Sequence, residues 1–385
     1  MKITRLRPIR LCAAVPAEHR VRSRSGVRRF RATTLVRIDT DGGPSGYGSC
    51  SGNGALIAAV IERVLEPLLL GSDPTDIDGF WKKAYVRGGV KEFGSRGVGV
   101  VALSGVEVAL WDIRGKLEGL PLYRLLGDKC RERVPVYATA LYPDEPDAVV
   151  ERARLFAEAG FHGVKIKVGF DLAQDIQIVR AVRRALGKRF PIMTDANQGY
   201  ERDVALRAAD AFAAEDVLWF EEPLFVEDIE GHALLRKQGR VRIAVGENLH
   251  TAYAFENFCA REAADYLQPD VARVGGIGEV KKIAALAREY GGALSLHTWG
   301  DAVALAASVH LSAALPECAI MEFDATRNPL REELLREPLE VRHGFIIPPE
   351  KPGLGVEPDP DALRRFESLG TETLSLRDET VKTST

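Results

Sequence analysis

Gly163-Val-Lys-Ile-Lys-Val168 is the stretch of sequence that decides the fold. Two lysines alternate with three aliphatic side chains, so a strand here places both lysines on one face and the aliphatic residues on the other. Seven further runs are also short, apolar and strand-like. They cover residues 134–139, 191–195, 217–221, 243–247, 266–270, 293–297 and 319–322.

Seven of these eight runs end in an ionisable side chain. The residues are Lys167, Asp195, Glu221, Glu247, Asp270, His297 and Glu322, and neighbours are 28, 26, 26, 23, 27 and 25 residues apart. A strand, a helix and two short loops need about this many residues, and segments such as 204–213 and 280–288 have the apolar spacing of helices. Eight parallel strands at this period predict an α/β fold, a (β/α)7β TIM-like barrel over residues 131–345.

The segments on either side of the barrel have a different character. Residues 1–130 contain strand-like alternation at 3–11 and 31–38 and helical patterns at 56–70 and 98–117, which predicts an N-terminal α+β domain. Residues 346–385 are rich in proline and then polar. We expect this C-terminal segment to return to the first domain and its tail, from residue 371, to fray.

Composition sets the class of protein. Hydrophobic content of 46%, charged content of 28% and a net charge of −3 are typical of a globular enzyme and favour neither nucleic acid nor membrane as a partner. The five cysteines are scattered without a CxxC pair, and no run of about 18 apolar residues occurs. A reducing compartment, the cytoplasm, is therefore expected.

Three carboxylates predict a metal site. Asp195, Glu221 and Glu247 end three successive strands, and the carboxyl ends of barrel strands share one face. Oxygen ligands without Cys or His suit Mg²⁺, whereas a zinc hydrolase barrel would place His near the first strand, and residues 134–139 contain none. Unrelated surface carboxylates are the competing interpretation. Glu222 should point away from this face, which makes it a weaker candidate.

Two candidate bases flank the carboxylates. Lys165 and Lys167 share the inward face of their strand, and a neighbouring ammonium and a metal would lower the pKa of Lys167. His297 ends the strand that follows Asp270, so the carboxylate of Asp270 can hydrogen-bond one nitrogen of its imidazole. This contact raises the basicity of the other ring nitrogen. A pair of solvated lysines at a strand edge is the plainer alternative.

Two bases on opposite sides of a substrate carboxylate held by a metal predict that one of them removes the proton from the carbon beside that carboxylate. The metal stabilises the enediolate that forms when this proton leaves. Glu322, protonated by its acidic surroundings, could hydrogen-bond the other carboxylate oxygen. Return of a proton from the opposite face gives racemisation, and protonation of a leaving hydroxyl gives dehydration. A Schiff-base aldolase acting through Lys167 is a third possibility.

These motifs resemble the mandelate racemase-like subgroup of the enolase superfamily, in the mandelate racemase / muconate lactonizing enzyme family. The resemblance rests on Lys165-Ile-Lys167, Asp195-Ala-Asn197, Glu221-Glu-Pro223, Gly246-Glu-Asn248, Asp270, His297 and residues 104–112 with Gly119-Leu-Pro121. It implies that the α+β domain caps the barrel, and that Mg²⁺ binds Asp195, Glu221 and Glu247. It also implies a Lys167 base, a His297–Asp270 dyad and a homo-oligomer.

Most members with these residues are acid-sugar dehydratases, so the resemblance implies dehydration of an aldonate or aldarate to a 2-keto-3-deoxy acid. Racemases, epimerases and a lactone cycloisomerase share the same residues and remain alternatives, and a non-catalytic relative is a remoter one. Whether Glu322 or Asp324 is the electrophilic carboxyl is left open.

Substrate contacts are expected from the cap and the barrel mouth. Six arginines crowd a twelve-residue stretch, namely Arg20, Arg22, Arg24, Arg28, Arg29 and Arg31. In members of the family this loop closes over the substrate, and such a charge favours a doubly charged acid such as an aldarate. A solvated basic hairpin or a subunit contact explains the stretch equally well. Candidate contacts are Asn197, Tyr47, Trp299 and Arg24, with Arg327 as a further one.

Overall fold

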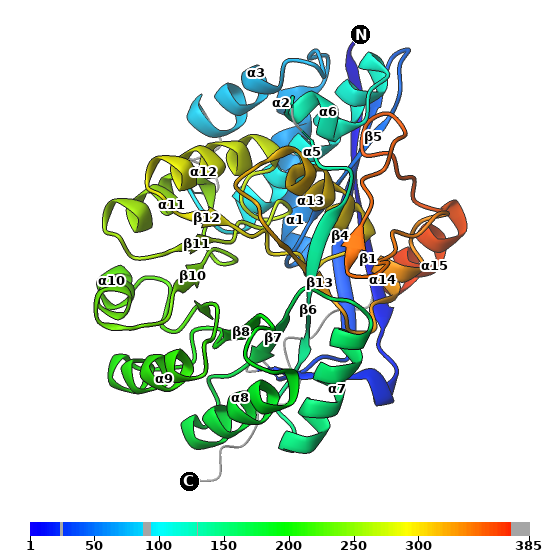
Figure 1. Cartoon of the computed structure of the whole chain (residues 1–385). Coiled ribbons are helices and arrows are strands. Elements are labelled where there is room, and N and C mark those ends of the chain that lie inside the picture. Colours follow the sequence, from blue (N-terminus) through cyan, green and yellow to red (C-terminus); the bar gives the residue numbers. More distant parts are fainter. Residues whose placement is uncertain (24–25, 88–93, 129, 371–385) are drawn as a thin grey trace.

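The structure is a computed structural model, and it describes residues 1–23, 26–87, 94–128 and 130–370. The tail from residue 371, for which fraying is expected, therefore lies outside the described residues. A curled parallel sheet with its helices forms the larger part, and an antiparallel sheet with a second set of helices covers one side of it (Figure 1).

The larger part is the predicted (β/α)7β barrel. Its eight parallel strands lie in the order β12-β11-β10-β9-β8-β7-β6-β13, and a short antiparallel strand, β14 (Phe345–Ile346), pairs with β6. The strands are β6 (Val134–Leu141), β7 (Val164–Lys167), β8 (Ile192–Asp195), β9 (Phe220–Glu221), β10 (Ile243–Val245), β11 (Tyr266–Leu267), β12 (Ala293–Leu294) and β13 (Met321–Asp324). A parallel bridge between Leu294 and Cys318 closes the ring between β12 and β13.

Seven helices follow the first seven strands and cover the outside of the barrel. They are α7 (Pro146–Glu158), α8 (Leu172–Leu186), α9 (Arg202–Ala214), α10 (Ile229–Gln238), α11 (Thr251–Ala260), α12 (Ile277–Glu289) and α13 (Ala302–Ala314). Helix α8 illustrates how local sequence sets the bounds. The side chain of Asp171 accepts a hydrogen bond from the N–H of Gln174 at its start, and Gly187 follows its end with φ 79°.

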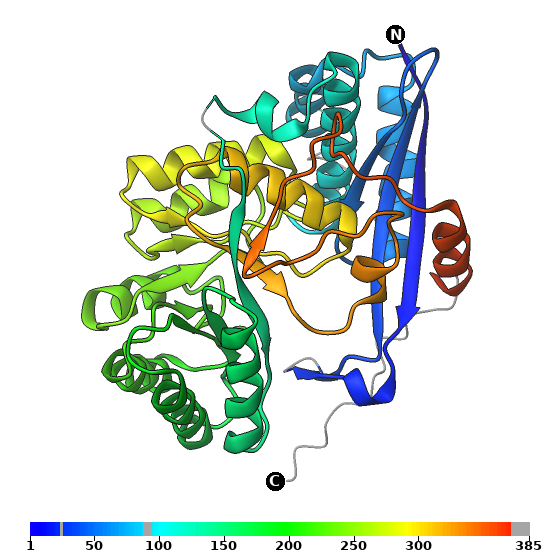
Figure 2. The same ribbon diagram turned by 45° about the vertical axis from the view of Figure 1, so that its right-hand side comes forward.

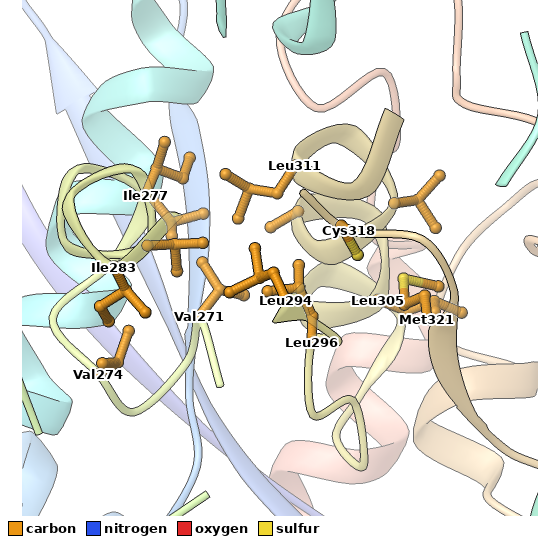
Figure 3. Close-up of a cluster of buried hydrophobic side chains, with 14 of the residues drawn as sticks. Val271, Val274, Ile277, Ile283, Leu294, Leu296, Leu305, Leu311, Cys318 and Met321 are labelled. Atoms are coloured by element: carbon orange, nitrogen blue, oxygen red, sulfur yellow. The ribbon is translucent and has the colours of Figure 1, made fainter. Parts of the chain in front are cut away.

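Aliphatic side chains fill the space between strands and helices. Figure 3 shows Ile277 and Ile283 of α12 meeting Leu294 beside Leu305 and Leu311 of α13. All five side chains are at most 2% exposed. Because burying one such side chain stabilises a fold by about 1.5–3 kcal/mol, this layer holds the helices against the barrel and keeps the strand ends in place.

The smaller part is a cap built on three antiparallel strands in the order β1-β4-β5. The strands are β1 (Ile3–Ala14), β4 (Phe30–Thr40) and β5 (Gly46–Cys50), and a two-residue hairpin, β2 (Arg22–Ser23) with β3 (Gly26–Val27), lies between the first two. The helical segments are α1 (Gly54–Val60), α2 (Glu66–Leu69), α3 (Ile77–Trp81), α5 (Val98–Glu118) and α6 (Leu122–Leu126), with π-helical turns at Ile61–Leu65 and Lys82–Arg87.

Strand β5 lies outside the predicted elements, and its glycines explain how it packs. A Cβ atom at Gly48 would lie 1.9 Å from the carbonyl oxygen of Gly105, and one at Gly46 would lie 2.2 Å from that of Ala109. The strand therefore lies directly against the backbone of the long helix α5, which only glycine allows.

The C-terminal segment returns to the cap. Helix α15 (Pro360–Gly370) lies beside β1, where Glu367 pairs with Arg7 at 2.9 Å (Figures 1 and 2). Before it, Gly353 bridges to Pro121, and the N–H of Leu354 donates to Asp112 of α5 at 2.8 Å. The exact domain boundaries, 130/131 and 345/346, stay predictions.

Two further observations bear on the class of protein. Within the described residues, none of the helices combines the length and apolar character needed to cross a membrane. All five cysteines lie in the described ranges, and none of them forms a disulfide bond there.

Candidate active site

The strand ends bring the predicted ionisable residues to one mouth of the barrel. In the sheet register Lys167 pairs with Asp195, and Asp195 pairs with Glu221, so these side chains leave their strands at one level. Glu247 follows two residues after β10. The register of neighbouring parallel strands therefore creates the cluster, as the spacing predicts.

Lys165 lies inside this cluster as a counter-ion to three carboxylates. Its Nζ is fully buried and lies 2.7 Å from Oε1 of Glu221, 2.8 Å from Oε1 of Glu322 and 3.4 Å from Oδ2 of Asp195. Burial lowers the pKa of Lys165, but the carboxylates of Glu221 and Glu322 outweigh burial and raise it well above its ordinary value. Lys165 therefore carries a fixed positive charge at the centre of the site.

Lys167 reaches the same cluster from the next position on its face of the strand. Its Nζ donates to Oδ2 of Asp195 at 2.5 Å and to Oδ1 of Asn197 at 2.9 Å. The predicted lowering of the pKa of Lys167 relies on Lys165 and a bound metal together, whereas the protein groups alone give the opposite balance. Burial and Lys165 do lower this pKa, but the adjacent Asp195 carboxylate outweighs them and raises it.

His297 approaches from the opposite side. Its Nδ1 lies 2.8 Å from Oδ2 of Asp270, the predicted contact, and its Nε2 lies 2.7 Å from Oε2 of Glu247. Burial lowers the pKa of His297, but the carboxylates of Glu322 and Glu247 outweigh it and raise the pKa well above its ordinary value. Both ring nitrogens are thus held by carboxylates, which fixes the orientation of the ring.

Asn197 joins the two sides of the site. Its Oδ1 accepts from Lys167, and its Nδ2 donates to Oε1 of Glu247 at 2.9 Å. Its backbone is left-handed, with φ 42°, a conformation that asparagine tolerates better than most residues. A continuous chain of contacts therefore runs from Lys167 through Asn197 and Glu247 to His297.

Glu322 lies in the cluster, whereas Asp324 does not. Glu322 accepts from the hydroxyl of Thr139 at 2.6 Å and from the N–H of Thr298 at 3.0 Å, while Asp324 pairs with Arg31 of the cap at 3.0 Å. The expectation that Glu322 is protonated is wrong. Burial raises its pKa, but the charges of Lys165 and His297 outweigh burial and lower it to about 2.

The three predicted metal ligands provide the donor set of a hard cation. Burial and the neighbouring Asp195 raise the pKa of Glu221 to about 8, so the lysines do not fully offset the crowding of carboxylates. Among the described residues no three His, Cys, Asp or Glu side chains are grouped as a metal site, and the carboxylates are paired with Lys165, Lys167 and His297 instead. Oxygen ligands are those that Mg²⁺ prefers, and a bound cation would offset the remaining repulsion between the carboxylates. The three residues therefore fit Mg²⁺.

Glu222 differs from its prediction. Strand β9 ends at Glu221, and Glu222 has a left-handed backbone with φ 38°, so the alternation of a strand no longer directs its side chain. Nδ2 of Asn248 lies 2.8 Å and 3.0 Å from the two carboxylate oxygens of Glu222 and 3.3 Å from Glu247. Burial and then Glu247 raise the pKa of Glu222 well above its ordinary value. The prediction that it points away from the carboxylates is wrong.

Gln268 and Trp219 complete the surroundings of Glu221, and sequence reasoning missed both. Nε2 of Gln268 donates to Oε2 of Glu221 at 2.7 Å, and Nε1 of Trp219 lies 3.3 Å from the same oxygen. Both precede a predicted strand end by two residues, so the two-residue period places them on its inward face. That period is the signal that could have found them.

The predicted substrate contacts divide into two groups. Asn197 lies in the site, and the ring of Trp299 lies under the guanidinium groups of Arg28 and Arg31 at 4.6 and 4.0 Å. Tyr47 lies elsewhere, beside Arg37 on the cap sheet. It is near the start of β5, and it is the other end of this strand, at Ser49, that contacts the barrel. Arg24 lies outside the described residues.

Two further side chains, Arg327 and Asp301, lie outside the carboxylate cluster. Arg327, the additional candidate, pairs with Glu332 and Glu333 next to α14 (Pro329–Glu332) and contacts none of the residues in the cluster. The carboxylate of Asp301 accepts from Thr33 at 2.7 Å and from Ser49 at 2.5 Å and so ties the cap strands to the start of α13.

Comparisons with known proteins agree with this architecture. Residues 11–127 match the family described as mandelate racemase / muconate lactonizing enzyme, N-terminal domain, and residues 148–362 match the family described as enolase C-terminal domain-like. A D-galactarolactone cycloisomerase of Agrobacterium fabrum is 39% identical over 382 residues, which cover 95% of this chain and 99% of the relative.

Two further relatives extend the comparison. An L-talarate/galactarate dehydratase of Salmonella typhimurium is 38% identical over 79% of this chain and 74% of its own. The crystal structure of a racemase from Streptomyces coelicolor A3(2) with bound magnesium superposes with a TM-score of 0.86, at 32% identity over 94% of this chain and 99% of the other. The chain belongs to the mandelate racemase / muconate lactonizing enzyme family of the enolase superfamily.

Proposed function

We propose that this protein removes the proton beside the carboxylate of an acid sugar, forms an enediolate and then expels a hydroxyl group as water, which yields a 2-keto-3-deoxy acid. The observation that carries the proposal is the chain of contacts from Lys167 through Asn197 and Glu247 to His297. It holds two candidate bases on opposite sides of one cluster of carboxylates.

Asp195, Glu221 and Glu247 are the proposed holders of Mg²⁺. When bound, Mg²⁺ polarises the substrate carboxylate and offsets the negative charge that builds up as the proton leaves. This part of the proposal is supported by the all-oxygen donor set, by the raised pKa of Glu221 and by the family to which the chain belongs.

Lys167 and His297 are the proposed bases, one for each face of the substrate. Asp270 keeps the imidazole of His297 in one tautomer, with the other nitrogen free to take or give a proton once substrate displaces its contact with Glu247. Lys165 acts as a fixed charge beside the developing anion. Glu322, ionised in this structure, holds Lys165 and Thr298 in place.

A racemase, epimerase or cycloisomerase reaction is the second candidate. It is favoured by the relative named D-galactarolactone cycloisomerase, which matches 95% of this chain. In a racemase or epimerase the second base returns a proton to the same carbon, whereas in a lactone cycloisomerase the ring oxygen leaves in place of a hydroxyl group and the ring opens. The residues required are the same, so the outcome depends on the substrate and not on the bases.

Incubation with a library of aldonates and aldarates in the presence of Mg²⁺, followed by assay of 2-keto acids, tests the proposal. We expect a keto acid from at least one substrate, loss of the activity with EDTA and recovery with Mg²⁺. Epimerised product without keto acid, or keto acid formed only from the corresponding lactones, would support the second candidate. Trapping by borohydride together with indifference to EDTA would indicate a Schiff-base aldolase. Failure to exchange any α-proton in D₂O would indicate a non-catalytic relative.

We also propose a cytoplasmic location and a homo-oligomeric assembly. The five cysteines, four of them buried, form no disulfide within the described residues, which supports a reducing compartment. The proposed partner is a small carboxylate, and neither nucleic acid nor membrane is expected to bind.

A further inference from the structure

Three buried N–H groups between the cap and the barrel lack an acceptor. They are Nε and Nη1 of Arg31 and Nε1 of Trp299, and within the described residues none has a hydrogen-bond partner. Arg31, near the start of β4, is only 5% exposed. A buried donor without an acceptor costs roughly 1–3 kcal/mol, and more when it is charged, so three in contact call for an explanation.

The side chain of Arg31 is held in place from one end. Its Nη2 lies 3.0 Å from Oδ2 of Asp324 and also donates to the hydroxyl of Thr326. Thr326 in turn donates to Asp324 at 2.5 Å, so this hydrogen bond holds both partners of Arg31 in position. The ion pair therefore fixes the guanidinium group, while its other two nitrogens find no hydrogen-bond partner among the residues that the structure describes.

The charges around Arg31 do not balance. Arg28 lies over the same ring of Trp299 as Arg31, and Arg31 is paired with Asp324. Arg331 lies 3.7 Å from Asp324 but is paired more closely with Glu332, at 2.5 Å, so Asp324 is left to offset the two arginines over the ring. Burial and the neighbouring Arg31 lower the pKa of Arg28, in the direction expected where a further anion is needed. An added carboxylate would supply both the missing charge and the missing acceptors.

This group of donors faces the candidate active site. Trp299 follows His297 by two residues, and the charge of Glu247 acts on Arg28. Burial raises the pKa of Tyr142, and the charges of Lys167, Arg31 and Arg28 all act on it in the opposite direction, so this buried tyrosine lies near both the base and the arginines. An acid sugar extending from the carboxylate cluster toward the cap would place its far end there.

We propose that Arg31, Trp299 and Arg28 form a second anion subsite that binds the distal carboxylate of the substrate, which makes the substrate a dicarboxylic acid sugar. The inference rests on the proposed function because it assumes that the first carboxylate binds at the barrel mouth. It deepens that function by separating aldarates from aldonates, which differ only in whether the far carbon is a carboxylate or a hydroxymethyl group.

Two variants, each with a matched control, test the subsite. Arg31→Lys keeps a charge for Asp324 but removes the free guanidinium nitrogens, and Arg37→Lys makes the same change at an ion pair elsewhere on β4. Trp299→Phe removes one donor and keeps the ring, and Trp81→Phe removes a buried donor that also lacks a partner but lies in α3. Trp299→Phe keeps the test informative if Arg31→Lys fails to fold.

The measurement compares an aldarate with the aldonate of the same configuration, by kcat/KM and by calorimetric binding with Mg²⁺ present. We expect the wild-type protein to favour the aldarate by about 100-fold or more. The preference should fall by about 30-fold or more in Arg31→Lys and by about 5-fold in Trp299→Phe, and it should stay unchanged in both controls. Equal loss for both acids, or no preference in the wild-type protein, would overturn the proposal.

The binding arm distinguishes this inference from the proposed function. If no acid sugar is converted, the proposed function fails, while binding of the dicarboxylic acid that is weakened by Arg31→Lys but not by Arg37→Lys still supports the subsite. If acid sugars are converted but mono- and dicarboxylic acids bind alike, the subsite is rejected and the function stands.

Discussion

Glu107 of the cap helix α5 accepts a hydrogen bond from the backbone N–H of Ile277, the first residue of the barrel helix α12, at 2.7 Å. Its other oxygen accepts from the N–H of Gly278 and from Nε1 of Trp111, both at 2.9 Å. One fully buried carboxylate thus satisfies the first turn of a barrel helix and anchors the cap beside the loop that carries Asp270.

This contact predicts a pH-dependent part of the stability. Burial raises the pKa of Glu107 from 4.5 to about 7, more than its hydrogen bonds lower it. The folded state then binds the proton more tightly than the unfolded state, so the contribution is complete below pH 4.5 and is lost as the pH rises through 7. By pH 8 the loss is about 3 kcal/mol.

Urea unfolding of the wild-type protein and Glu107→Gln at pH 5, 6, 7 and 8 checks this. The variant cannot ionise, so the free energy of unfolding of the wild-type protein should fall relative to it by about 2.5 kcal/mol between pH 5 and 8. Parallel pH dependences of the two proteins would show that Glu107 is not the group responsible.

Removal of either candidate base should stop proton transfer on one face of the substrate. We expect Lys167→Met and His297→Asn each to lower kcat by about 10²–10⁴-fold, the usual contribution of a positioned acid or base. Exchange of the α-proton in D₂O, followed by NMR, shows which face each base serves. The controls are Lys188→Met and His343→Asn, two exposed positions away from the cluster, where asparagine also suits the left-handed backbone of His343. Unchanged exchange in both base variants would disprove the two-base scheme.

Asp270→Asn should act through the imidazole. Asp270 accepts from Nδ1 of His297, and an asparagine there supports the wrong tautomer while leaving the ring in position. We expect a loss of up to about 10⁴-fold in kcat with little change in KM, because in the proposed scheme Asp270 acts on the imidazole and not on the substrate. A variant that changes KM alone would place Asp270 in substrate binding instead.

Gln268→Leu should weaken the binding of Mg²⁺. Gln268 donates to Oε2 of Glu221, and residues that orient a metal ligand typically contribute 10–100-fold to affinity, so we expect a loss of about this size. Calorimetric titration with Mg²⁺ measures it without reference to activity. Gln238→Leu, an exposed position at the end of α10, is the control. Wild-type affinity in Gln268→Leu would show that Lys165 alone suffices to orient Glu221.

The barrel and the positions of the strand ends followed from local patterns. Alternation of Lys165 and Lys167 with aliphatic residues defines the inward face of β7, and the regular interval to Asp195, Glu221 and Glu247 reflects one strand and one helix per unit. These signals lie within a few residues of each other or repeat at a constant spacing, so a single sequence contains them. Parallel strands then bring their ends together without further information.

Charge states and the placement of Glu222 required the tertiary structure. The pKa values of Lys167 and Glu322 depend on which opposite charges lie within about 4 Å, and the sequence predicted that of Glu322 in the wrong direction. Glu222 departs from strand alternation because its backbone is left-handed after β9 ends. Such distances and dihedral angles result from packing between distant segments.

The sequence by itself determined the barrel, the order of its carboxylates and bases and the adjacency of Asp270 and His297, because periodicity and strand direction are local properties. Only the tertiary structure decided that Glu107 holds the cap on α12 and that Arg31 meets Trp299 with nitrogens that none of the described residues pairs. Those contacts join residues about 170 and 270 positions apart, and only the docking of the cap on the barrel, a product of the whole core, brings them together.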